Sequence, residues 1–229
     1  MSFRCAQSSI QKKAVMAVTG LFLLGFVIVH MLGNLQIFLG QDQLNGYAEH
    51  LEELPFLLWP ARVFLLTTLT VHMLTAFCLA LENKNARPVR YMHEATVQAS
   101  YASRTMVMSG LIIFAFIIFH LLHFTFGKIH PEFCHLQDSK GRDDTYSMVI
   151  LSFRDFRITA AYIFAMAVLC LHLSHGASSI CQSLGFNNEK WRGNIKLTGN
   201  ALAGLIFIGN SSIALASLLG FLQLPKGGN

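Results

Sequence analysis

Five long apolar runs without charged side chains alternate with polar connections along the chain. They cover residues 14–41, 63–81, 105–127, 158–188 and 197–225. A helix needs about 20 mostly apolar residues to cross a bilayer, and each run is close to that length or longer. The pattern therefore predicts an all-α integral membrane protein, a single domain over 1–229, with helices at about 14–39, 60–82, 105–127, 157–182 and 197–222.

The connections carry their own local signals. Residues 40–55 are expected to form a loop with a short amphipathic turn at 44–54. Pro60 suits the first turn of the second helix, where its missing N–H leaves no hydrogen bond unmade. The first apolar run is too long for the core of a signal peptide, so we interpret it as a retained helix.

The composition agrees with this class. The chain is 53% hydrophobic and 13% charged, with a mean hydropathy of +0.49. Soluble domains carry roughly 25% charged residues. Water alone is therefore an unsuitable solvent for this chain.

The net charge of +5 follows the predicted topology. With the N-terminus in the cytoplasm, the inner segments hold ten lysines and arginines against three acids. The outer segments hold seven against nine. This is the positive-inside pattern. It places the C-terminus outside and makes a nucleic-acid partner a poor explanation for the basic excess.

The histidines within the apolar runs are the candidate functional residues. His30 and His120 each follow a glycine by ten residues, in the runs 20–30 and 110–120, and His72 and His172 lie in two further runs. At about 1.5 Å per residue, His30 and His120 lie roughly 25 Å from the inner helix ends, and the other two roughly 15 Å. Four histidines on four helices therefore form two levels.

Imidazoles in paired levels suit haem iron, since a neutral ring nitrogen is a good axial ligand. Gly33 and Gly176, one turn beyond His30 and His172, would leave room for a flat macrocycle, and Gly20 and Gly110 lie near the inner level. A single membrane histidine more often bonds another helix or lines a pathway. Four in matched pairs favour ligation.

The remaining polar candidates have less specific patterns. His123 and His175 lie one turn beyond proposed ligands, where they could support the site or simply pack. His50, His93, His130 and His135 fall in polar connections and are expected to be solvated. The five cysteines show neither C-x-x-C nor C-x-x-C-H, which excludes ordinary c-type haem attachment and gives no zinc or iron–sulfur spacing. The phenylalanines of the third run are expected to face lipid.

These residues resemble the cytochrome b subunit of succinate dehydrogenase and fumarate reductase, in the class with one polypeptide, five helices and two b haems. The resemblance covers nearly the whole chain. It is carried by Thr19-Gly20 with His30, His72 within 69–74, Ser109-Gly110 with His120, His172-Leu-Ser-His-Gly176, and the connecting segments 86–91 and 102–106.

The resemblance implies that His72 and His172 bind the haem nearer the cytoplasm, and that His30 and His120 bind the distal one. It implies a prokaryotic cytoplasmic-membrane complex with a flavoprotein, which carries the succinate/fumarate site, and with an iron–sulfur subunit. This chain would hold neither flavin nor an iron–sulfur cluster. It would pass electrons between those clusters and a membrane quinone, menaquinone or ubiquinone.

One position departs from the family. Some members that oxidise quinol bear a glutamate two residues before the haem ligand on helix four, where this chain has Cys170. Quinone chemistry needs a proton donor or acceptor within hydrogen-bond reach. The outer carboxylates Glu49, Glu52 and Glu53 are available, and we take Glu52 as the candidate, although all three could simply be solvated.

Three alternatives stay open on the sequence. The chain could be the membrane cytochrome of a hydrogenase or formate dehydrogenase, which would have different soluble partners. It could be a histidine-lined metal or proton transporter, or a haem-free structural anchor, and both of these would be colourless. The physiological direction, succinate oxidation or fumarate reduction, is not fixed by the sequence.

Overall fold

The computed structural model describes residues 8–86, 105–186 and 188–225, and that part of the chain is helical, with no strand. Five of its helices are long and apolar enough to cross a membrane. The protein is thus an all-α, multi-pass membrane protein. The spans are α1 (Ser9–Asn34) with the 3₁₀ turn η1 (Leu35–Leu39), α3 (Pro55–Asn85), α5 (Met106–His120) with the π-helical turn η2 (Leu121–Thr125), α7 (Phe156–Ser183) and α8 (Glu189–Leu218).

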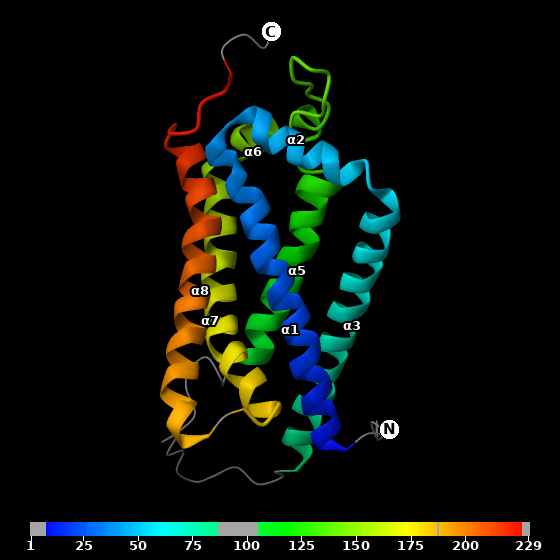
Figure 1. Cartoon of the computed structure of the whole chain (residues 1–229), viewed down its shortest axis with the longest axis vertical. Helices are drawn as coiled ribbons and strands as arrows, with labels where there is room; N and C mark the ends of the chain where they lie inside the picture. The colour runs from blue at the N-terminus through cyan, green and yellow to red at the C-terminus, as the bar shows by residue number, and fades with distance from the viewer. Residues whose placement is uncertain (1–7, 87–104, 187, 226–229) are drawn as a thin grey trace.

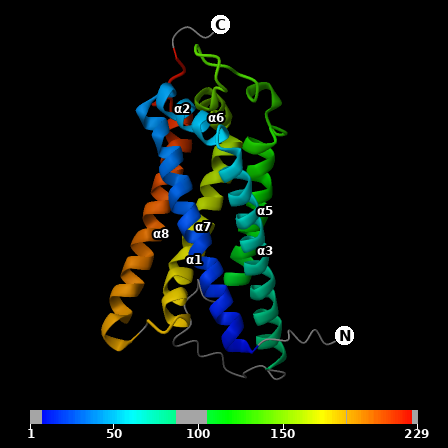
Figure 2. The same ribbon diagram turned by 45° about the vertical axis from the view of Figure 1, so that its right-hand side comes forward.

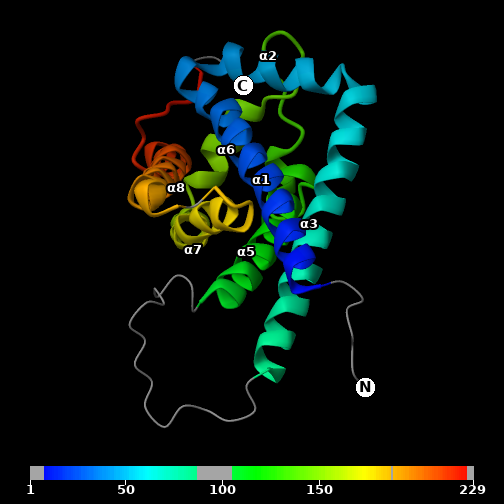
Figure 3. The same ribbon diagram turned by 60° about the horizontal axis from the view of Figure 1, so that its bottom comes forward.

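The spans form an elongated bundle whose α1 begins and whose α8 ends at opposite ends (Figure 1). Helices α7 and α8 pack against each other along most of their length, α1 crosses them, and α3 stands at the edge, where its main partner is α1 (Figure 2). Few contacts join α3 to α5. The view from below shows α1 crossing between α7 on one side and α3 on the other (Figure 3).

Two short helices and a loop cover one end of the bundle. Helix α2 (Gln41–Glu52) lies across that end, and α6 (Thr145–Phe153) lies beneath it (Figure 1). The amide of Asn45, which is fully buried, donates to Asp144 at 3.0 Å and to Asp138 at 3.2 Å, and its oxygen accepts from the Tyr146 backbone at 3.0 Å. We call this end the outer end.

Arg142 completes the polar cluster at the outer end. Its guanidinium donates to Asp138 at 2.8 Å and to Asp42 at 2.7 Å. Burial acts to raise the pKa of Asp138, but the bonds from Arg142 and Asn45 outweigh it and hold that pKa well below its usual range. The 3₁₀ segment η3 (Pro131–Phe133) precedes this loop.

The opposite, inner end is closed by a capped helix start and an ion pair. Ser8 caps α1 in a reciprocal capping box with Gln11. Lys12, one turn further, is only 4% exposed and pairs with Glu82 near the end of α3. A buried lysine requires such a partner, so this contact fixes α1 against α3 where both leave the apolar region.

The apolar side chains divide as a membrane protein requires. The main buried cluster lies in the outer half, where η1, α2, α6, α7 and α8 meet, and includes Ile37, Ile150 and Tyr162. Many large apolar side chains elsewhere are exposed, such as Phe56 at 76% and Leu197 at 69%. These faces would contact lipid rather than water.

Several local predictions are wrong. Pro60 is not in the first turn of the second span but inside it, because α3 already begins at Pro55. The fifth span begins at Glu189, eight residues before the predicted 197, because Asn188 caps it by accepting from the Trp191 backbone. The expected turn at 44–54 is instead the three-turn helix α2. The connecting segments 87–104, which include His93, lie outside the described residues.

Candidate cofactor site

A large cavity of about 1990 Å³ lies between α1, α3, α5 and α7. Pockets for drug-sized ligands occupy about 300–1,000 Å³, so this one has room for two large groups. The four histidines His30, His72, His120 and His172 all line it, among mostly apolar side chains. Each of the four is half-buried, as expected for rings that face a cavity.

On the inner side, helix α1 holds the histidine of α3. The hydroxyl oxygen of Thr19 lies 3.0 Å from Nδ1 of His72. The same hydroxyl donates to the Val15 carbonyl at 2.8 Å. Gly20, the next residue, lies against the ring, since a Cβ there would be 3.4 Å from Cε1 of His72.

Helix α5 repeats this arrangement toward α7. The hydroxyl of Ser109 lies 2.9 Å from Nδ1 of His172 and donates to the Met106 carbonyl at 3.1 Å. A Cβ on Gly110 would be 3.5 Å from Cε1 of His172. The inner level is therefore built twice from the same unit, in which a hydroxyl residue and a glycine on one helix hold a histidine on the next.

The hydrogen bonds fit one tautomer of both inner histidines. A hydroxyl has one proton to donate, and Thr19 and Ser109 each give theirs to a backbone carbonyl. With the hydroxyl proton on the carbonyl, Nδ1–H donates to the hydroxyl oxygen and Nε2 keeps its lone pair. A neutral imidazole with one nitrogen held and the other free is the form that binds a metal.

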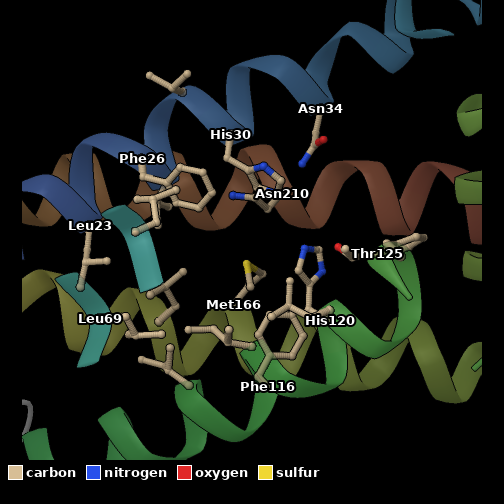
Figure 4. A pocket seen from close by; sticks show the side chains of 18 of the residues that line it. Leu23, Phe26, His30, Asn34, Leu69, Phe116, His120, Thr125, Met166 and Asn210 are labelled. Carbon is tan, nitrogen blue, oxygen red and sulfur yellow. The ribbon is translucent and has the colours of Figure 1, made fainter. Parts of the chain in front are cut away.

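At the outer level, His30 of α1 and His120 of α5 point toward each other across the cavity (Figure 4). Their ring centres are 5.8 Å apart and their planes lie at 88°. Two imidazoles bound to one metal at about 2 Å each have ring centres about 6 Å apart. Asn34 and Asn210 lie beside His30, and Thr125 lies further toward the outer end (Figure 4).

Tyr162 of α7 supports the outer level and was missed by the sequence analysis. Its hydroxyl lies 3.3 Å from Nδ1 of His120 and 2.9 Å from Nδ1 of His123. The π-helical turn η2 follows His120 directly, and such turns are frequent at functional sites. The sequence does mark this residue, because Tyr162 is the only tyrosine within the five predicted spans.

The two levels are well separated along the bundle. Thr19 marks the level of His72 on α1, and His30 follows it by eleven residues. Ser109 marks the level of His172 on α5, and His120 also follows by eleven. At about 1.5 Å per residue, both intervals correspond to about 16 Å. The sequence-based depths had placed the levels closer together.

The glycines do not all act as predicted. Gly20 and Gly110 line the cavity at the inner level, and Gly176 also lines it with open space beside it. Gly33 instead makes room for a tyrosine, since a Cβ there would be 2.7 Å from the Tyr47 hydroxyl. The prediction that Gly33 clears space for a macrocycle is wrong, because α2 folds back over α1.

The other histidines also differ in their surroundings. His123 is 1% exposed, and His130, which was expected to be solvated, is half-buried with its ring 5.4 Å from that of His123. His50 and His135 are exposed, as expected. His175 lies on α7 outside the cavity lining. The prediction for His130 is wrong because its loop folds against the end of α5.

The candidate proton-exchange residue lies at the outer mouth. Glu52 is exposed and lines both the large cavity and a small adjoining one with Arg142 and Asp143. Glu49 lines only the small cavity, and Glu53 neither. Cys170 is a free, half-buried thiol.

Within the described residues, no three histidine, cysteine, aspartate or glutamate side chains gather as a metal site. Haem iron needs only two axial ligands from the protein, so the paired histidines fit that group and not a multi-ligand ion site. No family model, curated protein or solved structure matches this chain.

Proposed function

We propose that this chain is the dihaem cytochrome b subunit of a succinate:quinone oxidoreductase, either a succinate dehydrogenase or a quinol:fumarate reductase. The observation that carries the proposal is the duplicated unit at the inner level, Thr19-Gly20 with His72 and Ser109-Gly110 with His172. It would present two imidazoles, one on α3 and one on α7, to one haem. Two haems of b type would supply one-electron transfer at two depths.

The residues of the two levels would then have different roles. His72 and His172 would hold the inner haem, and His30 and His120 the outer one. Thr19 and Ser109 would hold the inner rings in the ligating tautomer, and a held ring raises ligand basicity. Apolar walls from Phe26, Phe116 and Met166 would exclude water from the outer site (Figure 4).

The orientation and partners follow from the same proposal. The inner end, with most of the basic segments, would face the cytoplasm of a prokaryotic cell and bind the iron–sulfur subunit, which in turn binds the flavoprotein. Menaquinone or ubiquinone would react near the outer mouth of the cavity, where Glu52 is within the lining. This chain would carry no succinate site of its own.

The alternative functions predict a different colour or different co-purifying subunits. A metal or proton transporter would be colourless, and so would a haem-free anchor. The cytochrome of a hydrogenase or formate dehydrogenase would be red but would purify with other soluble subunits. The mirrored hydroxyl–histidine pairs favour a cytochrome over a transporter, because a transport pathway does not require its histidines to be held in one tautomer.

The test is purification of the whole complex from native membranes in mild detergent. The proposal predicts two haems per chain with a b-type pyridine haemochrome, reducible by quinol, together with a flavoprotein and an iron–sulfur protein. A complex that is complete but lacks haem would overturn the proposal. Haem with hydrogenase or formate dehydrogenase subunits would reassign the partner and reject the succinate branch.

A further inference from the structure

We propose that His123 and His130 form a proton relay between the outer surface and the outer end of the cavity, with Glu132 at its entrance and Tyr162 at its inner end. This inference rests on the proposed function, because it supplies the protons that quinone chemistry exchanges. It names a route that does not involve Glu52.

The inner half of the route is a pair of hydrogen-bonded groups. Tyr162 lines the cavity and is 7% exposed. Its hydroxyl lies 2.9 Å from Nδ1 of His123. His123 itself is 1% exposed and is absent from the cavity lining, so it lies behind Tyr162. The hydroxyl therefore links the cavity wall to a buried imidazole through one hydrogen bond.

The middle of the route is marked by two unpaired ring nitrogens. Nε2 of His123 and Nε2 of His130 are both buried and have no hydrogen-bond partner among the described residues. Buried polar groups in native proteins are nearly always bonded, so each exception requires an explanation. The two rings are neighbours, with centres 5.4 Å apart and planes at 54°.

That spacing is close to a direct bond between imidazoles. A hydrogen bond of about 3 Å between two ring nitrogens places the ring centres about 5 Å apart. A small rotation of either ring would thus join His123 to His130. Phe124 stacks on His123 at 4.1 Å, and Phe133 stacks on His130 at 5.2 Å. These contacts keep the two imidazole rings adjacent.

The outer half of the route reaches solvent. Nδ1 of His130 lies 3.2 Å from the carboxylate of Glu132, whose side chain is 57% exposed. The backbone amide of Glu132 and then the bond with His130 lower the pKa of Glu132, so it is ionised at neutral pH and accepts from the ring. The Cys134 thiol donates to the His130 carbonyl at 3.4 Å, which fixes the loop.

Imidazole suits this transfer because it accepts a proton at one nitrogen and releases one from the other. Oxidation of one quinol would release two electrons, which the two proposed haems would accept, and two protons. The protons would leave one after the other through Tyr162, His123 and His130 to Glu132 and the outer water. Quinone reduction would draw two protons inward by the same groups.

The experiment uses the complete complex in sealed vesicles with its outer end facing an external pH-sensitive dye that does not cross the membrane. A quinol is added and proton release outside is followed with haem reduction. His130→Gln and His123→Gln should each slow proton release about 10²-fold, with haem content and spectra unchanged. The exposed His50→Gln is the matched control and should behave as the native complex does.

Chemical rescue separates proton transfer from a structural role. The His130→Ala variant should release protons slowly. Imidazole in the outer buffer should restore the rate, because the site of the removed ring is next to the exposed carboxylate of Glu132. If the His130 and His123 variants keep both haems and release protons at the native rate, the relay is wrong. If Glu52→Gln alone blocks release, the route runs through Glu52 instead. Absence of haem from the native complex would instead reject the proposed function, and this outcome is distinct from a failure of the relay.

Discussion

The inner and outer histidine levels are held in different ways. At the inner level, His72 and His172 each receive the same support, a hydroxyl from the residue that precedes a glycine on the neighbouring helix. At the outer level, His120 shares the hydroxyl of Tyr162 with His123, while His30 lies beside Asn34 and Asn210 (Figure 4). One level is symmetric and local, and the other is asymmetric and connected to a surface loop.

This difference suggests a division of roles. A symmetric, doubly held pair favours one fixed ligand geometry, as an electron carrier requires. A shared hydroxyl with a buried histidine behind it allows protons to move near the outer level. We therefore expect substitutions at the inner level to affect haem binding most, and those at the outer level to affect proton exchange as well.

The largest expected effect comes from removing a ligand. Each of the four single substitutions of His30, His72, His120 and His172 to alanine should remove one haem of two, because an iron with one axial ligand is held poorly in an open cavity. Haem content by pyridine haemochrome should fall to about half in each. Retention of both haems in any one variant would break the assignment of that histidine.

The second-largest effect is expected from the two hydroxyl groups that contact the inner histidines. Ser109→Ala and Thr19→Val remove the groups that hold the inner imidazoles, and loss of such a partner typically weakens metal affinity about 10–100-fold. Haem retention during dilution or competition with apomyoglobin measures this loss. Ser212→Ala, a hydroxyl on α8 that bonds only the Gly209 carbonyl at 2.7 Å in the structure, is the matched control. Equal loss in this control would mean that the inner hydroxyls have no special role.

A smaller effect should follow at the outer level. Tyr162→Phe removes a hydroxyl that is 3.3 Å from His120, compared with 2.9 Å for Ser109 and His172. The longer contact is weaker, so outer haem affinity should fall less than inner affinity does in Ser109→Ala. The same haem-competition assay compares the two variants. An equal or larger loss in Tyr162→Phe would contradict the contrast between the levels.

The smallest effect concerns α2, which lies across the outer end of the bundle. The pKa of Asp138 is below its usual range in the folded protein, so its contribution to stability is present above the unfolded pKa of about 4 and is lost as pH falls through the lower folded value. Hydrogen exchange in 41–52, corrected for intrinsic rates, should be constant from neutral pH to about pH 4 and faster below. In Asp138→Asn this acid-dependent step should be smaller but still present, because the pKa values of Asp42 and Asp144 in the same cluster are also lowered. An unchanged step in that variant would assign it to another carboxylate.

The sequence predicts the spans well because hydrocarbon excludes charge over a fixed length. It also predicts the residues of the inner level, since Thr19-Gly20 and Ser109-Gly110 lie in matching positions of two runs. It does not predict where α8 begins, because a cap at Asn188 extends the helix beyond the apolar run. Helix ends respond to single capping contacts more than to hydropathy.

The support of the outer level could not be predicted because it depends on tertiary folding. Gly33 receives Tyr47 only because α2 folds back, and His130 becomes half-buried only because the loop after α5 packs on His123. Neither pair has a fixed spacing in sequence. The role of Tyr162 likewise follows from the register of α7 against α5, although its isolation among the spans marked it as unusual.

The most direct measurement of the central claim is haem stoichiometry in paired variants of the intact complex. If His72 with His172, and His30 with His120, each bind one iron, His72→Ala/His172→Ala should keep one haem per chain and His72→Ala/His30→Ala should keep none. The opposite pattern, with both haems lost in the first double variant or one kept in the second, would contradict the account.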